Sequence, residues 1–434
     1  MSSPIIIVGA GAFGLSTALH LAQNGYDNVL VMDKAEQIPS GFSAANDLNK
    51  IVRAEYEDPF YTDLSLVQTQ QAIAAWKTPL LAAHFHQTGF LHCVSENAPP
   101  EAVATLNRFQ AAAERSPVLQ PYLVRVEGAQ AVRQHVWQYN EGTLPGWTGY
   151  LNRFDGYAHS ADALRAVFRA AQAAGVRFLL GEGGAVTEVV RAGSGSGGGK
   201  IRGVRTAAGR FHAAERVIVA AGAAAGRLVP ELGTQIVAKS WSVAHVQLTD
   251  DEASALRGIP VTYARDLGFF FEPDPATKLL KLCPMGGGIV NTDPHTGVSH
   301  APDSLEASTG WMPADDEAKL RRLLAQTLPQ LANRPLVHKS ICWFADSKDS
   351  DFIIDYVPGS EHSLVMLSGD SGHGMKMFPL VGQWVRALLE APDQRQPVAR
   401  WRWKGNQNDE GNWGGAVSWR LGDTRELKDI KARL

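Results

Sequence analysis

Cysteine is scarce in this chain, and the cysteines that it has are far apart. The 434 residues include three of them, Cys93, Cys283 and Cys342. An odd number of widely spaced thiols does not suit a disulfide framework, and the spacing matches no common metal-ligand motif. We therefore expect a reducing compartment and no bound metal, so that each cysteine needs its own explanation.

Long apolar runs and a large net charge are also missing. No apolar stretch approaches the ~18 residues that a membrane-spanning helix needs. The apolar start at Ile5–Val8 lacks the basic flank of a secretory signal. The formal net charge is -3, which is not the charge of a nucleic-acid-binding protein. The sequence predicts a protein with neither nucleic-acid nor membrane partners.

The length and composition are typical of a globular protein with more than one domain. A chain of 434 residues exceeds what a single hydrophobic core usually fills. Hydrophobic residues make up 45% of the chain and charged residues 20%, which is ordinary for globular domains. We expect two domains, a monomer, and an interior large enough to exclude water from a reaction.

A glycine-rich turn near the N-terminus predicts a nucleotide site. Gly9-Ala-Gly11-Ala-Phe-Gly14 follows a predicted buried strand and opens a predicted helix at Ala12–Asn24. In such a unit Gly9 permits the tight turn, Gly11 lets the backbone approach a pyrophosphate, and Gly14 permits close packing of helix on strand. The N-terminus of the helix then stabilises the phosphate charge.

An acidic residue completes this nucleotide motif. Asp33 closes the next predicted strand, nineteen positions after Gly14, where a carboxylate can accept hydrogen bonds from ribose hydroxyls. The complete strand, turn, helix, strand and acid unit is much more specific than the glycines alone. FAD and NAD both fit it.

A second glycine-rich turn favours the longer flavin cofactor. Ser368–Gly374 precedes an apolar helical pattern at Val381–Leu389. The two turns could hold opposite ends of one cofactor, with the second helix N-terminus near the flavin ring. A simple helix-capping turn is the alternative interpretation.

Strand and helix patterns alternate over much of the chain, which favours an α/β fold. Helical patterns at Tyr61–Trp76 and Ala161–Ala173 are followed by strand-like runs, and Arg216–Ala221 is a further apolar strand. The Gly193–Gly199 run of glycine and serine predicts a hairpin loop, and the stretch from Trp401 an irregular tail. A helical region (84–145) and a strand-rich region (227–335) are assigned to a second domain that covers the nucleotide.

Five segments in order along the chain resemble the fructosyl amino acid oxidases, or amadoriases, which are relatives of monomeric sarcosine, pipecolate and saccharopine oxidases. The segments are Ala44–Arg53, Gly268–Pro273, Lys281–Cys283, Cys342–Asp346 with Phe352–Asp355, and Gly369–Lys376. The resemblance extends from the N-terminus to about residue 420. It implies FAD rather than NAD.

The resemblance also implies a fold and a division into domains. The expected fold is an FAD-binding domain of the Rossmann type found in glutathione reductase and sarcosine oxidase, with an α+β substrate domain that contains a mostly antiparallel sheet. The expected boundaries are 1–83, 146–226 and 336–434 for the FAD-binding domain, and 84–145 and 227–335 for the substrate domain.

For the flavin, the resemblance assigns roles to three residues. Cys342 matches the cysteine that carries the flavin through a thioether at its 8α-methyl position, a bond that a thiolate can form with an electron-poor ring. Lys281 matches a lysine that contacts flavin N5 through water and assists the reaction with oxygen. Lys50 matches a basic residue on the other side of the ring. Without the resemblance, the cysteine would be interpreted as a small buried hydrophobe and the lysines as surface charges.

For the substrate, the resemblance implies a carboxylate clamp. Arg53 and Lys376 match the pair that binds the substrate carboxylate in sarcosine oxidase, where the guanidinium offers a fork and the ammonium a point charge. Arg420 matches an arginine that binds the amino-acid carboxylate in amadoriases. Gly372, His373 and Gly374 belong to the second turn and are expected at the cofactor, and Lys376, which follows them, is expected to contact both the cofactor and the substrate. Structural ion pairs are the alternative role for Arg53 and Lys376.

The sequence departs from the amadoriase pattern at the substrate. Typical amadoriases have Asp-Glu after the Lys-x-Cys segment, and the glutamate contacts the sugar-bearing substrate, whereas Pro284 and Met285 stand here. Ala224 replaces a tryptophan that often follows the Gly-Ala of the second nucleotide segment. The substrate site is therefore expected to differ from that of an amadoriase.

The predicted function is FAD-dependent oxidation of the carbon–nitrogen bond of a secondary amine by O2. The products would be an imine, which water hydrolyses, and H2O2. A fructosyl amino acid is the first expectation for the substrate, with saccharopine, N-methyl amino acids and pipecolate as alternatives. An NAD(P)-linked dehydrogenase and a flavin-binding sensor remain as other classes.

The last three residues fit a targeting signal. Ala432-Arg433-Leu434 has the small-basic-leucine pattern of the peroxisomal address, whose standard form is Ser-Lys-Leu. This pattern predicts recognition by the peroxisomal import receptor, and a cytoplasmic location is the alternative.

Overall fold

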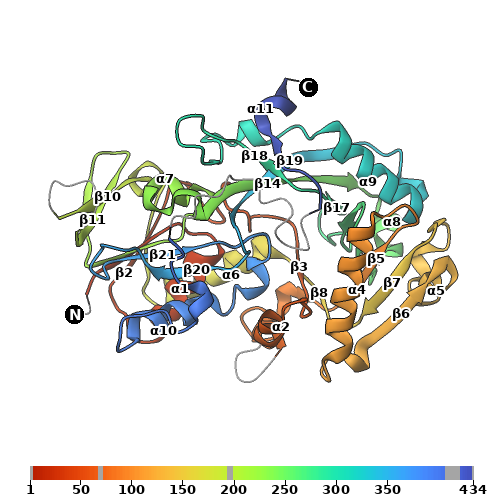
Figure 1. The fold of residues 1–434 in the computed structure, drawn as a ribbon, viewed down its shortest axis with the longest axis horizontal. Coiled ribbons are helices and arrows are strands. Elements are labelled where there is room, and N and C mark those ends of the chain that lie inside the picture. The colour runs from red at the N-terminus through yellow and green to blue at the C-terminus, as the bar shows by residue number, and fades with distance from the viewer. Residues whose placement is uncertain (1–2, 67–71, 193–198, 406–420, 433–434) are drawn as a thin grey trace.

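The computed structural model describes residues 3–66, 72–192, 199–405 and 421–432. Most of the predicted loop at Gly193–Gly199, the predicted carboxylate ligand Arg420 and the last two residues lie outside these ranges. Figure 1 shows the described elements, with the two main sheets side by side and β14 (Ile236–Gln247) at their junction.

The first main sheet has six strands and carries the N-terminal glycine-rich turn. Every neighbouring pair is parallel except the edge pair β20–β21, which is antiparallel. The order of the strands is β20 (Ile353–Tyr356), β21 (Leu364–Ser368), β13 (Arg216–Val219), β1 (Ile5–Val8), β2 (Val29–Asp33) and β9 (Arg177–Leu180).

Both faces of the six-stranded sheet are covered, which explains why its strands are uniformly apolar. Ile5 and Ile7 pack in the core under the helices α1 (Ala12–Gln23), α6 (Ser160–Ala173) and α10 (Val381–Glu390). Ile6 and Val8 face the opposite core. There they meet a three-stranded sheet of β10 (Val186–Arg191), β11 (Ile201–Thr206) and β12 (Phe211–Ala213).

The second main sheet has ten strands and is mostly antiparallel. Its two longest strands, β14 and β19, pair with each other, and β14 also pairs with β17 and β18. The ten strands are β5 (Phe90–Val94), β6 (Leu123–Glu127), β7 (Thr148–Asn152), β14, β15 (Val261–Ala264), β16 (Gly268–Phe270), β17 (Leu279–Pro284), β18 (Ile289–Val290), β19 (Leu336–Ser347) and β22 (Arg425–Glu426).

One face of the ten-stranded sheet is closed by helices, and the other faces the six-stranded sheet across a cavity. The apolar core on the closed face includes residues of α5 (Gly128–His135), α8 (Asp250–Ala255) and α9 (Ala314–Thr327). The longer α4 (Pro100–Arg115) packs on β5 and β7. Figure 1 shows α4, β6 and β7 at the end of the molecule far from α1 and α10.

A small sheet connects the two halves of the molecule. It consists of β3 (Lys50–Val52), β8 (Gly156–Ala158) and β4 (Phe85–His86). The short helices α2 (Pro59–Leu66) and α3 (Ala72–Trp76) follow β3. β3 packs against the single-turn helix η9 (Gly374–Met377), so the segment that carries Lys50 lies beside the second glycine-rich turn.

The α/β fold class with a mostly antiparallel second sheet is confirmed. The region 84–145, expected to be helical, also contains three strands, because its helices cover a sheet to which it contributes β5 and β6. The exact domain boundaries stay a prediction. β7 and β19 pair with strands of the ten-stranded sheet, which favours assigning both of them to the substrate domain. The expected boundaries place them in the FAD-binding domain instead.

Gly14 tests whether close packing of α1 on β1 is needed for this fold. A Cβ at Gly14 would overlap the carbonyl oxygen of Gly9, so we expect Gly14→Ala to lower the free energy of unfolding by about 1–3 kcal/mol. Denaturant unfolding measures this change. The control is Gly226→Ala in α7 (Ala225–Leu228), where the nearest atom to a new Cβ is 3.5 Å away. Equal stability of the two variants would contradict the interpretation.

Candidate active site

One cavity joins the nucleotide turn to the ten-stranded sheet. Its volume is about 1760 Å³, and twelve of the residues expected at cofactor or substrate line it. They are Gly9, Gly11, Asp33, Lys50, Arg53, Lys281, Met285, Cys342, Gly372, His373, Gly374 and Lys376. Gly14 is not in the lining, in keeping with its expected role in helix packing. The structure thus brings together residues that are up to 367 positions apart, from Gly9 to Lys376.

The first glycine-rich turn has the shape that a dinucleotide requires. Gly9 has φ 108°, a left-handed conformation that favours glycine, and a Cβ there would overlap the carbonyl oxygen of Ala220. A Cβ at Gly11 would lie 3.2 Å from Ser43 Oγ, so a side chain would fill the space between this turn and the facing loop. These residues fit a bound pyrophosphate at the N-terminus of α1.

Asp33 lies at the end of β2 and lines the cavity, as the motif predicts. Its carboxylate accepts hydrogen bonds from the backbone N–H groups of Ala10 (2.8 Å) and Ala35 (2.9 Å). These bonds hold the side chain in place. Each oxygen keeps a further lone pair, so the carboxylate can still accept a bond from a ribose hydroxyl.

The second glycine-rich turn is held against β14. Gly372 has φ 73°, and a Cβ there would overlap the ring of Trp241. His373 is fixed through both ring nitrogens, with Nδ1 2.9 Å from Tyr56 Oη and Nε2 2.8 Å from the carbonyl oxygen of Ser350. The turn is therefore a rigid wall of the cavity.

Three charged side chains form a cluster at the centre of the cavity. Asp47 Oδ2 lies 2.5 Å from Lys281 Nζ and 2.7 Å from Lys50 Nζ. Lys281 also donates to the backbone oxygen of Asn49 at 2.7 Å and is only 1% exposed. One carboxylate thus holds two ammonium groups, one from β17 and one from β3, and the cluster keeps a net charge of one positive unit.

The lysines and the carboxylate of this cluster stabilise each other's charged forms. Burial alone would raise the pKa of Asp47, but Lys281 and Lys50 outweigh it and hold that pKa below its usual range. Burial opposes the charge of Lys50 as well, yet Asp47 keeps its pKa above the usual value. Asp47 and Lys50 are therefore ionised at neutral pH.

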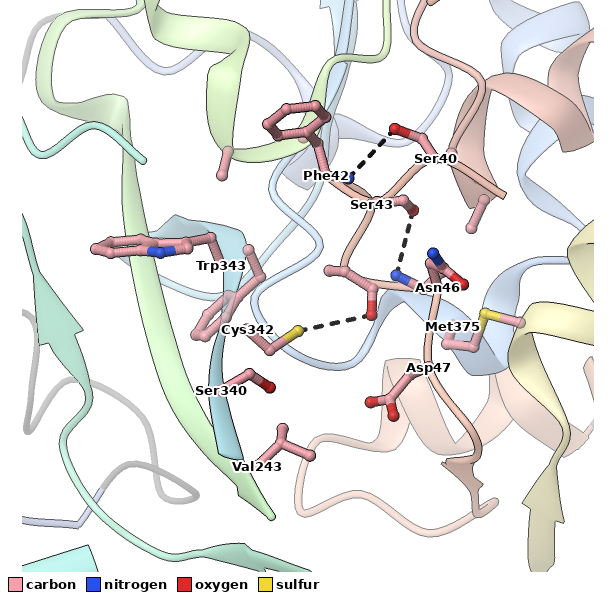
Figure 2. Close-up of a pocket in the computed structure, with 18 of the residues that line it drawn as sticks. Ser40, Phe42, Ser43, Asn46, Asp47, Val243, Ser340, Cys342, Trp343 and Met375 are labelled. Carbon is pink, nitrogen blue, oxygen red and sulfur yellow. Dashed lines mark hydrogen bonds between the residues drawn. The ribbon is translucent and has the colours of Figure 1, made fainter. Parts of the chain in front are cut away.

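Cys342 lies beside this cluster on β19. Lys50 Nζ is 3.9 Å from its Sγ, and the thiol lies 3.7 Å from the carbonyl oxygen of Ala44. Figure 2 shows the sulfur pointing from β19 toward the loop that carries Ser43, Asn46 and Asp47. Burial raises the pKa of Cys342, whereas the ammonium of Lys50 opposes that effect. A nearby cation is what a reactive cysteine needs.

Arg53 and Lys376 meet over one aromatic ring. The guanidinium carbon of Arg53 is 5.1 Å from the centroid of Tyr56, and Lys376 Nζ is 4.6 Å from it. Arg53 also stacks on Phe109 at 4.5 Å. Two cations that approach each other at the edge of a cavity can bind a carboxylate together, so the geometry fits the predicted clamp.

Met285 belongs to an apolar and aromatic wall. It is 6% exposed and packs in a cluster with Phe90, Tyr157, Val261, Tyr263 and Phe271. The partly buried Phe269 packs against this cluster and stacks on Tyr263 at 5.3 Å. Where the family resemblance leads us to expect a carboxylate, this cavity presents a thioether and aromatic rings.

The sequence alone did not assign a role to Asp47, although its position three residues before Lys50 was a signal for an ion pair. His245 was also missed. It is the β14 residue paired with Lys281, it lines the cavity, and burial together with Lys281 lowers its pKa to about 4. Only the pairing of β14 with β17 reveals this neighbour, and no local pattern predicts it.

Comparison with known proteins identifies the family. Residues 4–388 match the model of the family described as FAD dependent oxidoreductase. The chain is 32% identical to the L-saccharopine oxidase of Schizosaccharomyces pombe over 446 aligned residues, which cover 99% of this chain and 98% of that protein. The chain therefore belongs to the FAD-dependent oxidoreductase family.

Solved structures support the same assignment. The fructosamine oxidase of Aspergillus fumigatus (Amadoriase II), solved in complex with FSA, superposes with a TM-score of 0.88 at 31% identity, covering 99% of this chain and 96% of that one. Amadoriase I of the same organism gives 0.85 at 31% identity, with coverage of 99% and 96%. The expected family, the fold and an FAD-dependent oxidase of amines are confirmed by these relatives.

Two negative findings apply to the described part of the chain. None of its helices is both long and apolar enough to cross a membrane. Within the same residues, no group of three or more histidine, cysteine or acidic side chains is arranged to hold a metal ion.

The charged cluster predicts a pH-dependent contribution to stability. Because the pKa of Asp47 is held below its unfolded value, its stabilisation is complete above about pH 5 and is lost as the pH falls through the folded pKa. We expect Asp47→Asn to cost about 3–5 kcal/mol at pH 7, since it leaves two lysines without their carboxylate. The difference from the unmodified protein should shrink below about pH 4.

Chemical denaturation of both proteins from pH 3 to pH 8 measures this. Asp162→Asn is the matched control, because that carboxylate also pairs with a cation but is 48% exposed. A constant difference across the whole pH range would show that the ion cluster is not its cause.

Proposed function

We propose that this protein oxidises the carbon–nitrogen bond of a small secondary amine that carries at least one carboxylate, with FAD as cofactor and O2 as acceptor. The observation that carries this proposal is the single cavity in which the nucleotide turn, Cys342, the Asp47 cluster and the Arg53–Lys376 pair all meet. The family membership supports FAD rather than NAD. FAD would accept a hydride from the carbon next to nitrogen and deliver the electrons to O2 as peroxide.

In this proposal the cofactor is attached through Cys342. The thiol points toward the loop Ser43–Asp47 and lies 3.7 Å from the carbonyl oxygen of Ala44. Lys50 is the cation that favours the thiolate needed for a thioether. Gly372 lies against Trp241, the β14 residue paired with Cys342, and His373 and Gly374 line the same cavity.

Lys281 assists the reaction with oxygen in this proposal. Its ammonium is buried, and Asp47 and the backbone of Asn49 hold it in one position. A cation that is fixed before the reaction stabilises negative charge on oxygen without any rearrangement. Lys50, held by the same carboxylate, is the second basic residue of the site.

Arg53 and Lys376 bind the substrate carboxylate, which places the neighbouring carbon and nitrogen inside the cavity. The aromatic wall around Met285 keeps that region dry. Dry surroundings favour the uncharged amine from which a hydride can leave, and water then hydrolyses the imine after the reaction.

Among substrate classes, the cavity favours an amino acid whose nitrogen carries a second carboxyalkyl group, the class to which saccharopine belongs. The oxidase of S. pombe named for saccharopine matches this chain along nearly its whole length. The apolar wall with Met285 offers no carboxylate for the hydroxyls of a sugar. Fructosyl amino acids remain the second candidate, because the amadoriase structures superpose with TM-scores up to 0.88.

The location of the protein follows as part of the proposal. A peroxide-forming oxidase suits the peroxisome, and the C-terminal Ala432-Arg433-Leu434 resembles its address. The import receptor is then the expected macromolecular partner.

A panel of amines tests the proposed function. The flavin-loaded protein should lose its yellow absorbance without oxygen when mixed with its substrate, and should release about one H2O2 per amine oxidised in air. The panel contains saccharopine, fructosyl lysine, sarcosine and pipecolate, with primary amino acids as controls. The colour should remain with the denatured protein and be released from Cys342→Ser. Failure of every secondary amine to bleach the flavin would refute the proposed function.

Met285 tests the substrate class. We expect Met285→Glu to lower kcat/KM for saccharopine by at least about tenfold, because a buried carboxylate would repel a substrate rich in carboxylates. Activity on fructosyl lysine should fall less or increase, since the new carboxylate can accept bonds from sugar hydroxyls. Met285→Leu is the matched control and should leave the ratio of the two kcat/KM values unchanged. An unchanged ratio in Met285→Glu would show that Met285 does not determine the substrate class.

A further inference from the structure

Lys376 is a buried lysine that has no counter-ion of its own among the described residues. It lies in η9, is 5% exposed and lines the cavity. Its Nζ faces the ring of Tyr56 at 4.6 Å. Among the residues that the structure describes, no carboxylate forms an ion pair with this ammonium. Burial without a counter-ion destabilises the charged form of a lysine and lowers its pKa.

One charged neighbour of Lys376 has the same sign. Arg53 shares the ring of Tyr56, with its guanidinium carbon 5.1 Å from the centroid. An arginine stays protonated at any ordinary pH. Burial is the main cause, and Arg53 the next, that lower the pKa of Lys376 well below its usual value.

Glu55 and Asp155 are buried carboxyl groups near Lys376, and both bind the same asparagine. Asn152 Nδ2 donates to Glu55 Oε2 at 3.1 Å and to Asp155 Oδ2 at 2.9 Å. The hydroxyl of Tyr150 donates to Glu55 Oε1 at 2.9 Å. Burial and the charge of Glu55 raise the pKa of Asp155 well above its usual range.

The other groups around the clamp have partners of their own. Glu55 and Asp155 share Asn152, Arg53 donates to the backbone oxygen of Glu55 at 2.8 Å, and His373 is bonded through both ring nitrogens. Among the described residues, none of these groups forms an ion pair with Lys376, so an anion that enters the cavity would be its first ion-pair partner.

We propose that Lys376 is an uncharged amine in the free protein and takes up the proton that the substrate nitrogen must lose. This inference rests on the proposed function. One proton passes from the substrate ammonium to Lys376 Nζ, which leaves a neutral secondary amine and a lysine ammonium. No electrons move in this step, and the total charge is unchanged. The new ammonium then pairs with the substrate carboxylate.

Proton transfer from the substrate to Lys376 meets two requirements of the site. Aliphatic amines are protonated at neutral pH, and a protonated nitrogen has no lone pair to support loss of hydride from the next carbon. A permanent second cation beside Arg53 would destabilise the free protein. Lys376 becomes charged only when a carboxylate is present to pair with it.

Proton uptake on binding a carboxylate that has no amine tests the inference. The probe is methoxyacetate, in which an ether oxygen replaces the nitrogen, bound to the flavin-loaded protein. Calorimetry in buffers with different ionisation enthalpies counts the protons. We expect about one proton taken up per molecule bound at pH 7.5. Lys376→Arg, which is always charged, should bind the probe with no uptake, and Lys376→Met should bind it weakly with no uptake. Binding to the unmodified protein without uptake overturns the inference.

A second measurement needs no ligand. If Lys376 is neutral when folded, the unfolded chain binds one more proton at this residue, so the contribution of Lys376 to the stability rises with pH toward about pH 10. The difference in Tm between Lys376→Met and the unmodified protein should therefore shrink as the pH rises from 7 to 10. A difference that does not change with pH overturns the inference.

The amine panel separates this inference from the proposed function. If no secondary amine bleaches the flavin but methoxyacetate binding takes up a proton, the proposed function fails and the charge state of Lys376 stands. If an amine is oxidised and no proton is taken up with methoxyacetate, the function stands and the role of Lys376 as proton acceptor fails.

Discussion

The ion cluster around Asp47 is the interaction on which the site depends. Its carboxylate binds Lys281 from the ten-stranded sheet and Lys50 from the small sheet at the same time. Removing this carboxylate would leave two ammonium groups without their partner, which costs several kcal/mol. The cluster therefore fixes the positions of the two sheets relative to each other, and it also fixes a positive charge next to Cys342.

The basic side chains of the cavity have two different environments, one at the Asp47 cluster and one at the Arg53–Lys376 clamp. At the Asp47 cluster, both ammonium groups are paired with one carboxylate. At the Arg53–Lys376 clamp, burial and the like charge of Arg53 lower the pKa of Lys376 well below its usual value. A permanent cation suits the stabilisation of negative charge on oxygen, whereas a cation that forms on binding suits the capture of a carboxylate. Aromatic rings of the wall with Met285 face both sites, since the ring centroid of Phe271 lies 5.1 Å from Lys281 Nζ and that of Phe90 lies 6.0 Å from the guanidinium carbon of Arg53.

The sequence predicted the parts of the site that are encoded locally. The Gly9–Gly14 turn, Asp33 and the strands beside them follow from periodicity and from what glycine permits. Cys342, Lys281 and Arg53 were assigned through the family resemblance, and the structure places them in one cavity. The neighbours Asp47, His245 and the Glu55–Asp155 pair depend on strand pairing and on long-range contacts. One such contact is the hydrogen bond between Asn152 and Glu55, which are 97 positions apart. No local pattern carries that information.

The most direct test of the account is a crystal structure of the flavin-bound protein. The account predicts that the isoalloxazine ring lies between the two glycine-rich turns, with the sulfur of Cys342 bonded to it and with Lys281, still held by Asp47, at its redox-active edge. A ring located elsewhere, or a Lys281 ammonium turned away from it toward other partners, would contradict the account.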